Sequence, residues 1–158
     1  MPIIESEAQV FPPEDGAKRP GAIKVVLRTV REDDGSSREQ YIWKKGESVA
    51  VLVVHGSQLL FKKEYKYGVM DYVLTSAAGA VDKGETPEHA ALREVLEEFG
   101  RKVIELVPLS QSLVNMPDKT TEIQHLFIAF VGDEDQEPEP GKQFKVPLIA
   151  LKQVLRTR

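Results

Sequence analysis

The sequence predicts an α+β fold with many strands and two helices. Seven segments have the composition or alternation of strands: 23–30, 38–45, 47–55, 59–67, 71–79, 102–114 and 122–131. Two segments show the helical spacing of apolar residues: 87–99 and the stretch from Pro147 that carries Leu148, Leu151, Val154 and Leu155. Because the helices do not alternate with the strands, a repeating βαβ architecture is excluded.

The N-terminal segment differs from the rest of the chain. Residues 1–20 hold four prolines among acidic residues, which predicts an extended arm outside the core. The turn-forming run EDDGSS at 32–37 follows the first strand segment and predicts a hairpin with the second. No internal repeat follows and nothing marks a second domain, so residues 21–158 are expected to form a single domain.

The composition narrows the class of protein. The chain has 158 residues, 41% of them hydrophobic, which suits one globular domain with a full core. It has no cysteine, which excludes disulfides, zinc-thiolate sites and a cysteine nucleophile. The net charge is −4 and no face is dense in Lys or Arg, so no nucleic-acid partner is expected. No stretch is apolar enough to span a membrane and no signal peptide is visible, so the expected location is the cytoplasm.

The segment 87–99 has the boundary signals of a helix. Thr86 suits the N-cap, Pro87 suits the first turn, and Gly100 suits the position just past the end. A helix turns by about 100° per residue, and this spacing predicts one apolar stripe. The stripe consists of Leu92, Val95, Leu96 and Phe99.

Three carboxylates gather on the opposite side of this helix. Glu94, Glu97 and Glu98 fall within one arc, where each like-charge pair costs about 0.2–0.5 kcal/mol in an isolated helix. Arg93 is the one cation among them, and it is expected to pair with Glu97 at i+4. A solvated polar face explains such an arc in many helices. Clustered carboxylates with few counter-charges, preceded by the glycine-containing loop at 77–85, instead suit a divalent ion such as Mg²⁺ that works with substrate phosphates.

The same residues resemble the Nudix box, G-x5-E-x7-R-E-U-x-E-E-x-G-U, in which U is aliphatic. The fixed positions are met within residues 79–101 by Gly79, Glu85, Arg93, Glu94, Glu97, Glu98 and Gly100. A chance match to seven fixed positions is rarer than roughly one in 10⁵, which makes the solvated face the weaker explanation. The last aliphatic position is Arg101, and this departure bears on the packing of the helix end.

Beyond the box, residues 23–150 resemble the ADP-ribose pyrophosphatase branch of the family, through the stretches RTVREDDGSSREQYIW, VAVLVVHGSQLLFKKEYKYG and YVLTSAAGAVDKGE. The bacterial ADP-compounds hydrolases are similar too. The resemblance implies a Nudix-type α/β/α sandwich around a mixed β-sheet. It implies hydrolysis of a nucleoside diphosphate linked to a group X, with ADP-ribose giving AMP and ribose 5-phosphate.

Other functions remain open under this resemblance. Nucleotide sugars, dinucleotide cofactors and dinucleoside polyphosphates are alternative substrates of the same chemistry, and capped RNA is disfavoured by the acidic charge balance. A Nudix domain that senses a nucleotide without cleaving it is an alternative of another class, and the intact box carboxylates argue against it. A plain structural or interaction protein is disfavoured by the box itself.

The resemblance also gives roles to the box residues. In the family the positions of Glu94 and Glu98 bind divalent metal, and the position of Glu97 serves as ligand or base. Arg93 orients the glutamates, and Glu85 is a further metal-side or structural carboxylate. The implied cofactor is Mg²⁺, with Mn²⁺ as a possible substitute. The implied general base is Glu97 or Glu98.

Further residues are candidates for binding metal or substrate. By resemblance, Ala78 offers its backbone carbonyl to the metal. Gly79 lets backbone approach a ligand closely, and Lys66 keeps a cation where the branch has the arginine of Q-Y-R. Glu122 stands where the branch has a Glu near the substrate, with an exposed strand-start Glu as the equal alternative. Arg28 is a candidate contact of the diphosphate, with a solvated strand residue as the alternative.

Three departures from the branch bear on the identity of the substrate. The E-L-P-A-G stretch is TSAAG at 75–79, which lacks the Glu and the Pro. The Q-Y-R stretch is EYK at 64–66. Many members carry a catalytic Glu in the loop before the last strand, and here 142–144 reads KQF, without a carboxylate. Glu137 and Glu139 are the nearby alternatives.

The branch often forms a homodimer through an N-terminal strand, and the corresponding strand here carries Tyr41 and Trp43. A homodimer is therefore expected. Trp43 is expected in a core or interface rather than stacked on an adenine. His89 and His125 are expected to be structural.

Overall fold

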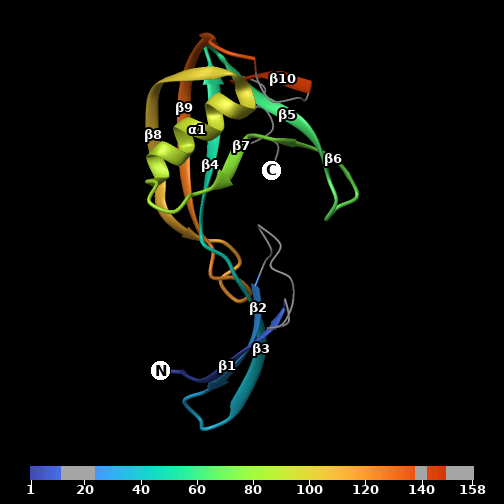
Figure 1. Cartoon of the computed structure of the whole chain (residues 1–158), viewed down its shortest axis with the longest axis vertical. Helices are drawn as coiled ribbons and strands as arrows, with labels where there is room; N and C mark the ends of the chain where they lie inside the picture. Colours follow the sequence, from blue (N-terminus) through green and yellow to red (C-terminus); the bar gives the residue numbers. More distant parts are fainter. Residues whose placement is uncertain (12–23, 138–141, 149–158) are drawn as a thin grey trace. The chain divides into compact units, whose positions relative to one another are not determined.

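The computed structural model describes residues 1–11, 24–137 and 142–148 (Figure 1). The chain divides into two compact units. Unit 1 is Met1–Gly46 with Val114–Ile123, and unit 2 is Glu47–Leu113 with Gln124–Arg158. The boundary expected after residue 20 stays a prediction, because it falls outside the described residues. Within the described ranges, no helix is long and apolar enough to cross a membrane.

Unit 1 contains a three-stranded antiparallel sheet in the order β1-β2-β3. The strands are β1 (Ile3–Phe11), β2 (Lys24–Arg31) and β3 (Ser37–Lys44). The pairing of β2 with β3 confirms the predicted hairpin, and Gly35, at φ 83°, supplies the left-handed conformation of its turn. The part of the predicted arm that is described is extended and largely exposed, and it pairs with β2 as a sheet strand.

Ion pairs run across this small sheet. Glu7 of β1 accepts hydrogen bonds from Arg28 of β2 at 2.9 and 3.0 Å, and it lies 2.7 Å from the ammonium of Lys44 of β3. The hydrogen bond from Lys44 is the main reason that the pKa of Glu7 is lowered, and Arg28 adds to the effect. Among the described side chains of unit 1, the buried hydrophobic ones are Val26 and Ile42. Charged pairs between strands therefore accompany the backbone pairing of this sheet, which has few buried apolar side chains.

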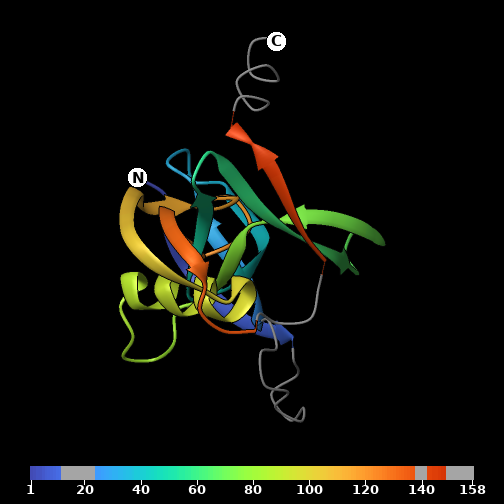
Figure 2. The same cartoon turned by 90° about the horizontal axis from the view of Figure 1, so that it is seen from above.

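Unit 2 contains a seven-stranded sheet and the helix α1 (Pro87–Phe99), which lies against one face of the sheet (Figure 2). The strands are β4 (Glu47–His55), β5 (Gln58–Lys66), β6 (Asp71–Thr75), β7 (Ala77–Ala80), β8 (Arg101–Val114), β9 (Ile123–Glu134) and β10 (Lys142–Pro147). Five of them follow the order β10-β5-β4-β9-β8, while β6 pairs with β5 and β7 pairs with β4. This arrangement confirms the α+β prediction.

The segment 71–79, expected to be one strand, is broken into β6 and β7. The two strands pair with different neighbours, β6 with β5 and β7 with β4. Ser76, which lies between them, donates its hydroxyl to the backbone carbonyl of Val51. Because the chain changes partner at Ser76, β7 contacts α1.

The core of unit 2 lies between α1 and the sheet. The fully buried residues of α1 are Ala90, Ala91, Val95 and Phe99. Those of β4 that belong to this core alternate along the strand, as Val49, Val51 and Val53. The predicted apolar stripe is wrong at Leu92, which is 39% exposed, because Ala90 and Ala91 belong to the buried face instead. The two small residues bring the helix backbone close to the sheet.

Two further expectations concern the ends of elements. Arg101, which replaces the last aliphatic residue of the box, is buried and donates a hydrogen bond to the carbonyl of Gly132 at 2.7 Å. The helix expected from Pro147 onward is wrong at Pro147, because this residue ends β10, and the positions after Leu148 lie outside the described residues. Two residues of that expectation, Pro147 and Leu148, are described. Of these, Leu148 donates its N–H to the carbonyl of Ser57 at 2.9 Å.

Candidate active site

Both ends of α1 are fixed by the residues that the sequence indicated. Thr86 accepts a hydrogen bond from the backbone N–H of His89 at 3.2 Å. Gly100 has φ 65° and donates its N–H to the carbonyl of Leu96 at 2.9 Å. These caps confirm the predicted bounds, and they set which turns of α1 face β7.

The carboxylate of Glu94 lies directly over Gly79 of β7. A Cβ atom added at Gly79 would lie 1.8 Å from Oε1 of Glu94, a distance at which the two atoms cannot coexist. The glycine is therefore required by a close approach of a side chain to the strand, and not by its own backbone angles. The Glu94 carboxylate thus fills the space that a side chain at position 79 would need.

Arg93 connects the loop before α1 to the carboxylates on the helix. Its guanidinium donates to both oxygens of Glu85 at 3.0 Å, and to the carbonyl of Ala80 at 3.0 Å. It also donates to Glu94 at 2.6 Å and to Glu97 at 3.4 Å, which confirms the predicted i+4 pair. These bonds, the pair to Glu85 above all, raise the pKa of Arg93, and the hydrogen bond from Arg93 lowers the pKa of Glu85.

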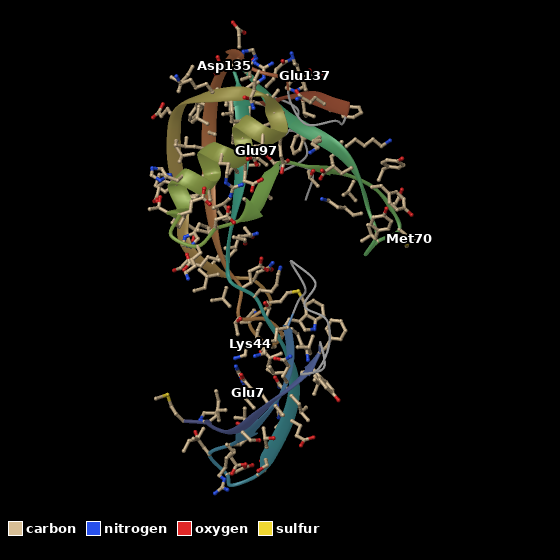
Figure 3. The ribbon with its side chains drawn as sticks, viewed as in Figure 1. Glu7, Lys44, Met70, Glu97, Asp135 and Glu137 are labelled. Carbon is tan, nitrogen blue, oxygen red and sulfur yellow. The ribbon has the colours of Figure 1, made fainter. Side chains whose placement is uncertain are left out.

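The helix face that carries the carboxylates is not simply solvated. The side chains of Glu94 and Glu98 are 12% and 13% exposed, while that of Glu97 is 47% exposed. Figure 3 labels Glu97 on α1. The solvated-face explanation is therefore wrong for Glu94 and Glu98. A helix rarely encloses two carboxylates one turn apart unless cations or hydrogen-bond donors meet them.

Glu98 is the least satisfied of the three carboxylates. One oxygen lies 3.5 Å from the backbone N–H of Ala78, and the other is buried without a hydrogen bond, 3.9 Å from the ammonium of Lys62. Burial raises the pKa of Glu98 to about 7, against the opposing effects of Lys62 and the Ala78 amide. A buried carboxylate oxygen that lacks a donor is a position where a cation or a proton fits.

A second charged cluster on β5 lies beside Glu98. Glu64 accepts hydrogen bonds at 2.8 Å from both Lys66 and Thr75, and it lies 3.1 Å from the ammonium of Lys62. The hydrogen bond from Lys66, followed by those from Thr75 and Lys62, lowers the pKa of Glu64 to about 2. Lys66, the candidate for substrate binding, is half-exposed and therefore accessible at the edge of this cluster.

The donors present fit a hard divalent cation. In the described part of the chain, no three acidic or histidine side chains already form a metal cage. Mg²⁺ does not need one, because it is usually held by one or two carboxylates together with water and substrate phosphates. The carboxylates of Glu98 and Glu94 could supply two such ligands. The ligand role of the Ala78 carbonyl stays a prediction.

Two predicted substrate-binding residues belong to unit 1. Arg28 is paired with Glu7, as described above. Glu122 is buried and accepts hydrogen bonds from Lys45 at 2.8 Å and from Asn115 at 3.5 Å. The alternative of an exposed strand-start residue is therefore wrong for Glu122. The substrate roles of both residues stay predictions.

The loop that follows β9 begins at the C-terminal end of α1. The backbone N–H groups of Asp135 and Gln136 donate to the carbonyl of Gly100 at 2.8 and 3.1 Å. Glu137, one alternative to the missing loop carboxylate, is the last described residue of this segment (Figure 3). Glu139 lies outside the described residues. In β10, Gln143 donates its side-chain amide to the carbonyl of Phe99 at 3.5 Å.

Sequence reasoning missed Lys62 as a member of this site. Lys62 is 4% exposed, although lysine is among the residue types that are seldom buried. A signal was available in the period of two along β5, where Leu60, Lys62 and Glu64 share one face and Leu60 belongs to the core. A charged residue at an inward-facing strand position predicts a buried partner of opposite charge.

Comparison with known proteins agrees with this geometry. The NUDIX domain family model matches residues 44–157, and the chain therefore belongs to the NUDIX domain family. The chain is 28% identical over 138 residues to the ADP-ribose pyrophosphatase of Bacillus subtilis (strain 168), covering 85% of this chain and 74% of that protein. It is 29% identical over 113 residues to the ADP compounds hydrolase NudE of Escherichia coli (strain K12), covering 69% and 60%. The chain thus spans less than two thirds of the second relative.

A solved structure shares the fold. The crystal structure of an ADP compounds hydrolase superposes with a TM-score of 0.79 at 24% identity, covering 98% of this chain and 83% of that one. At this identity the match concerns the fold, and it confirms the Nudix-type mixed sheet with α1 packed on it. The family match and the pyrophosphatase relatives together support a pyrophosphohydrolase enzyme.

Proposed function

We propose that the protein is a metal-dependent hydrolase that cleaves the diphosphate of a nucleoside diphosphate linked to a group X. ADP-ribose is the proposed substrate, with AMP and ribose 5-phosphate as the products. The observation that supports this best is Glu98, whose buried oxygen lacks a hydrogen bond one helical turn from the enclosed carboxylate of Glu94. The names of the relatives, which refer to ADP-ribose and ADP compounds, support the choice of substrate.

Glu94 and Glu98 are the proposed ligands of Mg²⁺, for which Mn²⁺ can substitute, and Glu97 and the carbonyl of Ala78 are proposed to complete the set. When bound, such an ion neutralises charge on the phosphoryl oxygens and makes a water molecule more acidic. The enclosed position of Glu94 and Glu98 limits competition from bulk water.

Water attacks one phosphorus atom of the diphosphate, and the bond from that phosphorus to the bridging oxygen breaks. The proton of the water must pass to a carboxylate. Glu98 is one proposed acceptor, and burial raises its pKa to about 7 in the chain without a bound metal ion. Glu97, which is more exposed and held by Arg93, is the other candidate for the same step.

Arg93 and Glu85 are proposed to position the carboxylates. The two hydrogen bonds between them fix the guanidinium, which leaves its remaining donors aimed at Glu94, Glu97 and the β7 backbone. Because a displacement of about 1 Å can cost 10²-fold in rate, such a support contributes to catalysis without touching the substrate.

Lys66 and Gly79 are the proposed substrate contacts in unit 2, and Arg28 and Glu122 are the proposed contacts from unit 1. We also keep the proposals of a homodimer, of the cytoplasm as the location, and of a partner that is a small molecule and not a nucleic acid. Each of the four contact residues can be tested by a single substitution followed by measurement of KM.

Product analysis tests the proposed function. The protein is incubated with ADP-ribose, ADP-glucose, NADH and diadenosine polyphosphates, each with Mg²⁺ or with EDTA, and the products are resolved by chromatography. We expect AMP to form fastest from ADP-ribose, and only with metal. Faster turnover of another compound would keep the reaction and replace the substrate. Binding of a nucleotide in a thermal-shift assay without turnover would overturn the enzyme proposal in favour of a nucleotide sensor.

A further inference from the structure

Strand β5 carries a lysine, Lys62, whose ammonium lies near one carboxylate of α1. The ammonium of Lys62 lies 3.1 Å from Oε1 of Glu64 and 3.9 Å from Oε2 of Glu98. The side chain is almost fully buried, so water cannot screen its charge. The ammonium of Lys62 is thus enclosed between one carboxylate of β5 and one of α1.

The neighbouring lysines of β5 are placed differently. Lys63 points to the opposite face of the strand, and its ammonium lies over the ring of Tyr72, 5.0 Å from the centroid. Lys66 shares a face with Lys62 but is half-exposed, and its contact is with the other oxygen of Glu64. Of these three lysines, Lys62 is the one whose ammonium lies against a carboxylate of the candidate metal site.

An ammonium and a divalent ion compete for the same oxygens. Mg²⁺ binds carboxylate oxygens at about 2.0–2.1 Å, so an ion shared by Glu64 and Glu98 needs the space between the two carboxylates. The ammonium of Lys62 occupies that space. Two cations this close repel strongly in an environment of low dielectric. The carboxylate of Glu94 faces Arg93 and Gly79 instead, one helical turn away.

We propose that Lys62 is a positioning residue that acts as a built-in counter-cation, keeping divalent ions on the Glu94 side of the carboxylate cluster and excluding one from between Glu64 and Glu98. This inference rests on the proposed function, because it presumes a divalent metal at Glu94 and Glu98. It adds a residue outside the Nudix box that sets how many divalent ions the site takes.

A Mn²⁺ titration followed by electron paramagnetic resonance tests the proposal on the full chain without substrate. The Lys62→Met variant removes the charge with a side chain of similar length that is suited to burial. The matched control is Lys63→Met, which removes a charge from the adjacent residue on the other face. We expect Lys62→Met to bind one additional Mn²⁺, or to bind Mn²⁺ at least tenfold more tightly, and Lys63→Met to match the wild type. Unchanged or weaker binding in Lys62→Met would overturn the proposal.

Two additional measurements test the role of Lys62. If Lys62→Met does not fold, as judged by circular dichroism, Lys62→Gln removes the charge and keeps a polar group. The position of bound Mn²⁺ can also be measured on the wild type, without any variant. Bound Mn²⁺ broadens the NMR signals of nearby backbone amides. The amide of Gly79, beside Glu94, should broaden at lower Mn²⁺ than that of Thr75, which lies beside Glu64. The reverse order would contradict the proposal.

Failure of the proposed function gives a different result. A wild type that binds no Mn²⁺ would remove the metal site at Glu94 and Glu98 that the proposed function requires. In that case Mn²⁺ binding by Lys62→Met would still support the exclusion of a cation by Lys62, and no binding by either protein would overturn both.

Discussion

Glu94 and Glu98 are one turn apart on the same helix, yet they differ in which segments of the chain surround them and in how well their carboxylates are hydrogen-bonded. Glu94 lies over Gly79 and receives a hydrogen bond of 2.6 Å from Arg93, and both of these neighbours belong to the Nudix box. Glu98 has a distant backbone donor in Ala78 and the ammonium of Lys62 at 3.9 Å, and Lys62 comes from β5, outside the box. One carboxylate is firmly paired, and the other is enclosed but incompletely paired.

The comparison shows that two carboxylates on one helix can have different hydrogen-bonding environments. A short charge-assisted hydrogen bond favours the ionised form of a carboxylate, which suits a permanent ligand. Burial without a full set of donors raises the pKa, as it does for Glu98, and this suits a group that takes up and releases a proton. The two carboxylates therefore differ in their hydrogen-bond partners, although the residue type is the same.

The largest expected effect comes from Glu98→Gln, which removes the proposed proton acceptor. We expect turnover to fall by roughly 10²–10⁴-fold, because this is the usual contribution of a general base. Glu97→Gln is the matched variant on the same helix, and a smaller loss is expected because Glu97 is more exposed. Initial rates of AMP formation at saturating Mg²⁺ measure both. If both variants kept near-wild-type turnover, neither residue would be the base.

The second largest expected effect comes from placing a side chain at position 79, where the Glu94 carboxylate lies. In Gly79→Ala the new Cβ must push the Glu94 carboxylate aside, and we expect turnover to fall by roughly 10²-fold, as for a displacement of about 1 Å. The flexible Glu94 side chain can yield, so the thermal midpoint should change little. Gly46→Ala is the control, since a Cβ there meets nothing within 4 Å. Equal rates in the two variants would show that the position of Glu94 is unimportant.

A third prediction concerns the charged cluster on β5 and the dependence of stability on pH. The pKa of Glu64 is about 2 in the folded protein and near 4.5 otherwise, so its ionised form stabilises the fold above pH 4.5, and this stabilisation is lost as the pH falls toward 2. The shift sets an upper limit of about 3 kcal/mol on the effect. Denaturant unfolding of Glu64→Gln and wild type should differ most near neutral pH and converge near pH 2. A difference that did not depend on pH would contradict this origin.

The smallest effect is expected in unit 1. Glu7 is partly exposed and pairs with Arg28 and Lys44, so Glu7→Gln should destabilise the protein by at most about 1 kcal/mol. Salt should reduce the difference, because exposed pairs are screened. Unfolding in low and high NaCl measures this. A loss that salt did not change would mean that Glu7 stabilises the sheet by packing rather than by charge.

The sequence was sufficient for the parts of the site that depend on local geometry. The caps at Thr86 and Gly100 and the i+4 pair of Arg93 with Glu97 follow from helical spacing, and the structure confirms them. The predicted stripe failed at Leu92, because hydrophobicity alone does not show that a helix will pack through alanines. The small size of Ala90 and Ala91 lets this face of α1 pack on the sheet, and this effect of side-chain size can be judged only when the opposing sheet is known.

The parts that sequence reasoning missed depend on contacts between distant segments. Lys62 reaches Glu98 from 36 positions away in the chain, and no local spacing predicts that contact. The break between β6 and β7 likewise depends on Ser76 meeting β4, a contact that a strand propensity cannot show. The resemblance gave candidate roles for the residues of the box, but it could not give their partners outside it.

The change of strand partner at Ser76 makes one backbone amide a natural reporter. The N–H of Ala78 on β7 lies 3.5 Å from the carboxylate of Glu98. A ¹⁵N label at this alanine would therefore sense the charge and position of Glu98 through its chemical shift, without any attached dye or spin label. Spectroscopy could then follow the protonation and position of the Glu98 carboxylate from the strand that faces it.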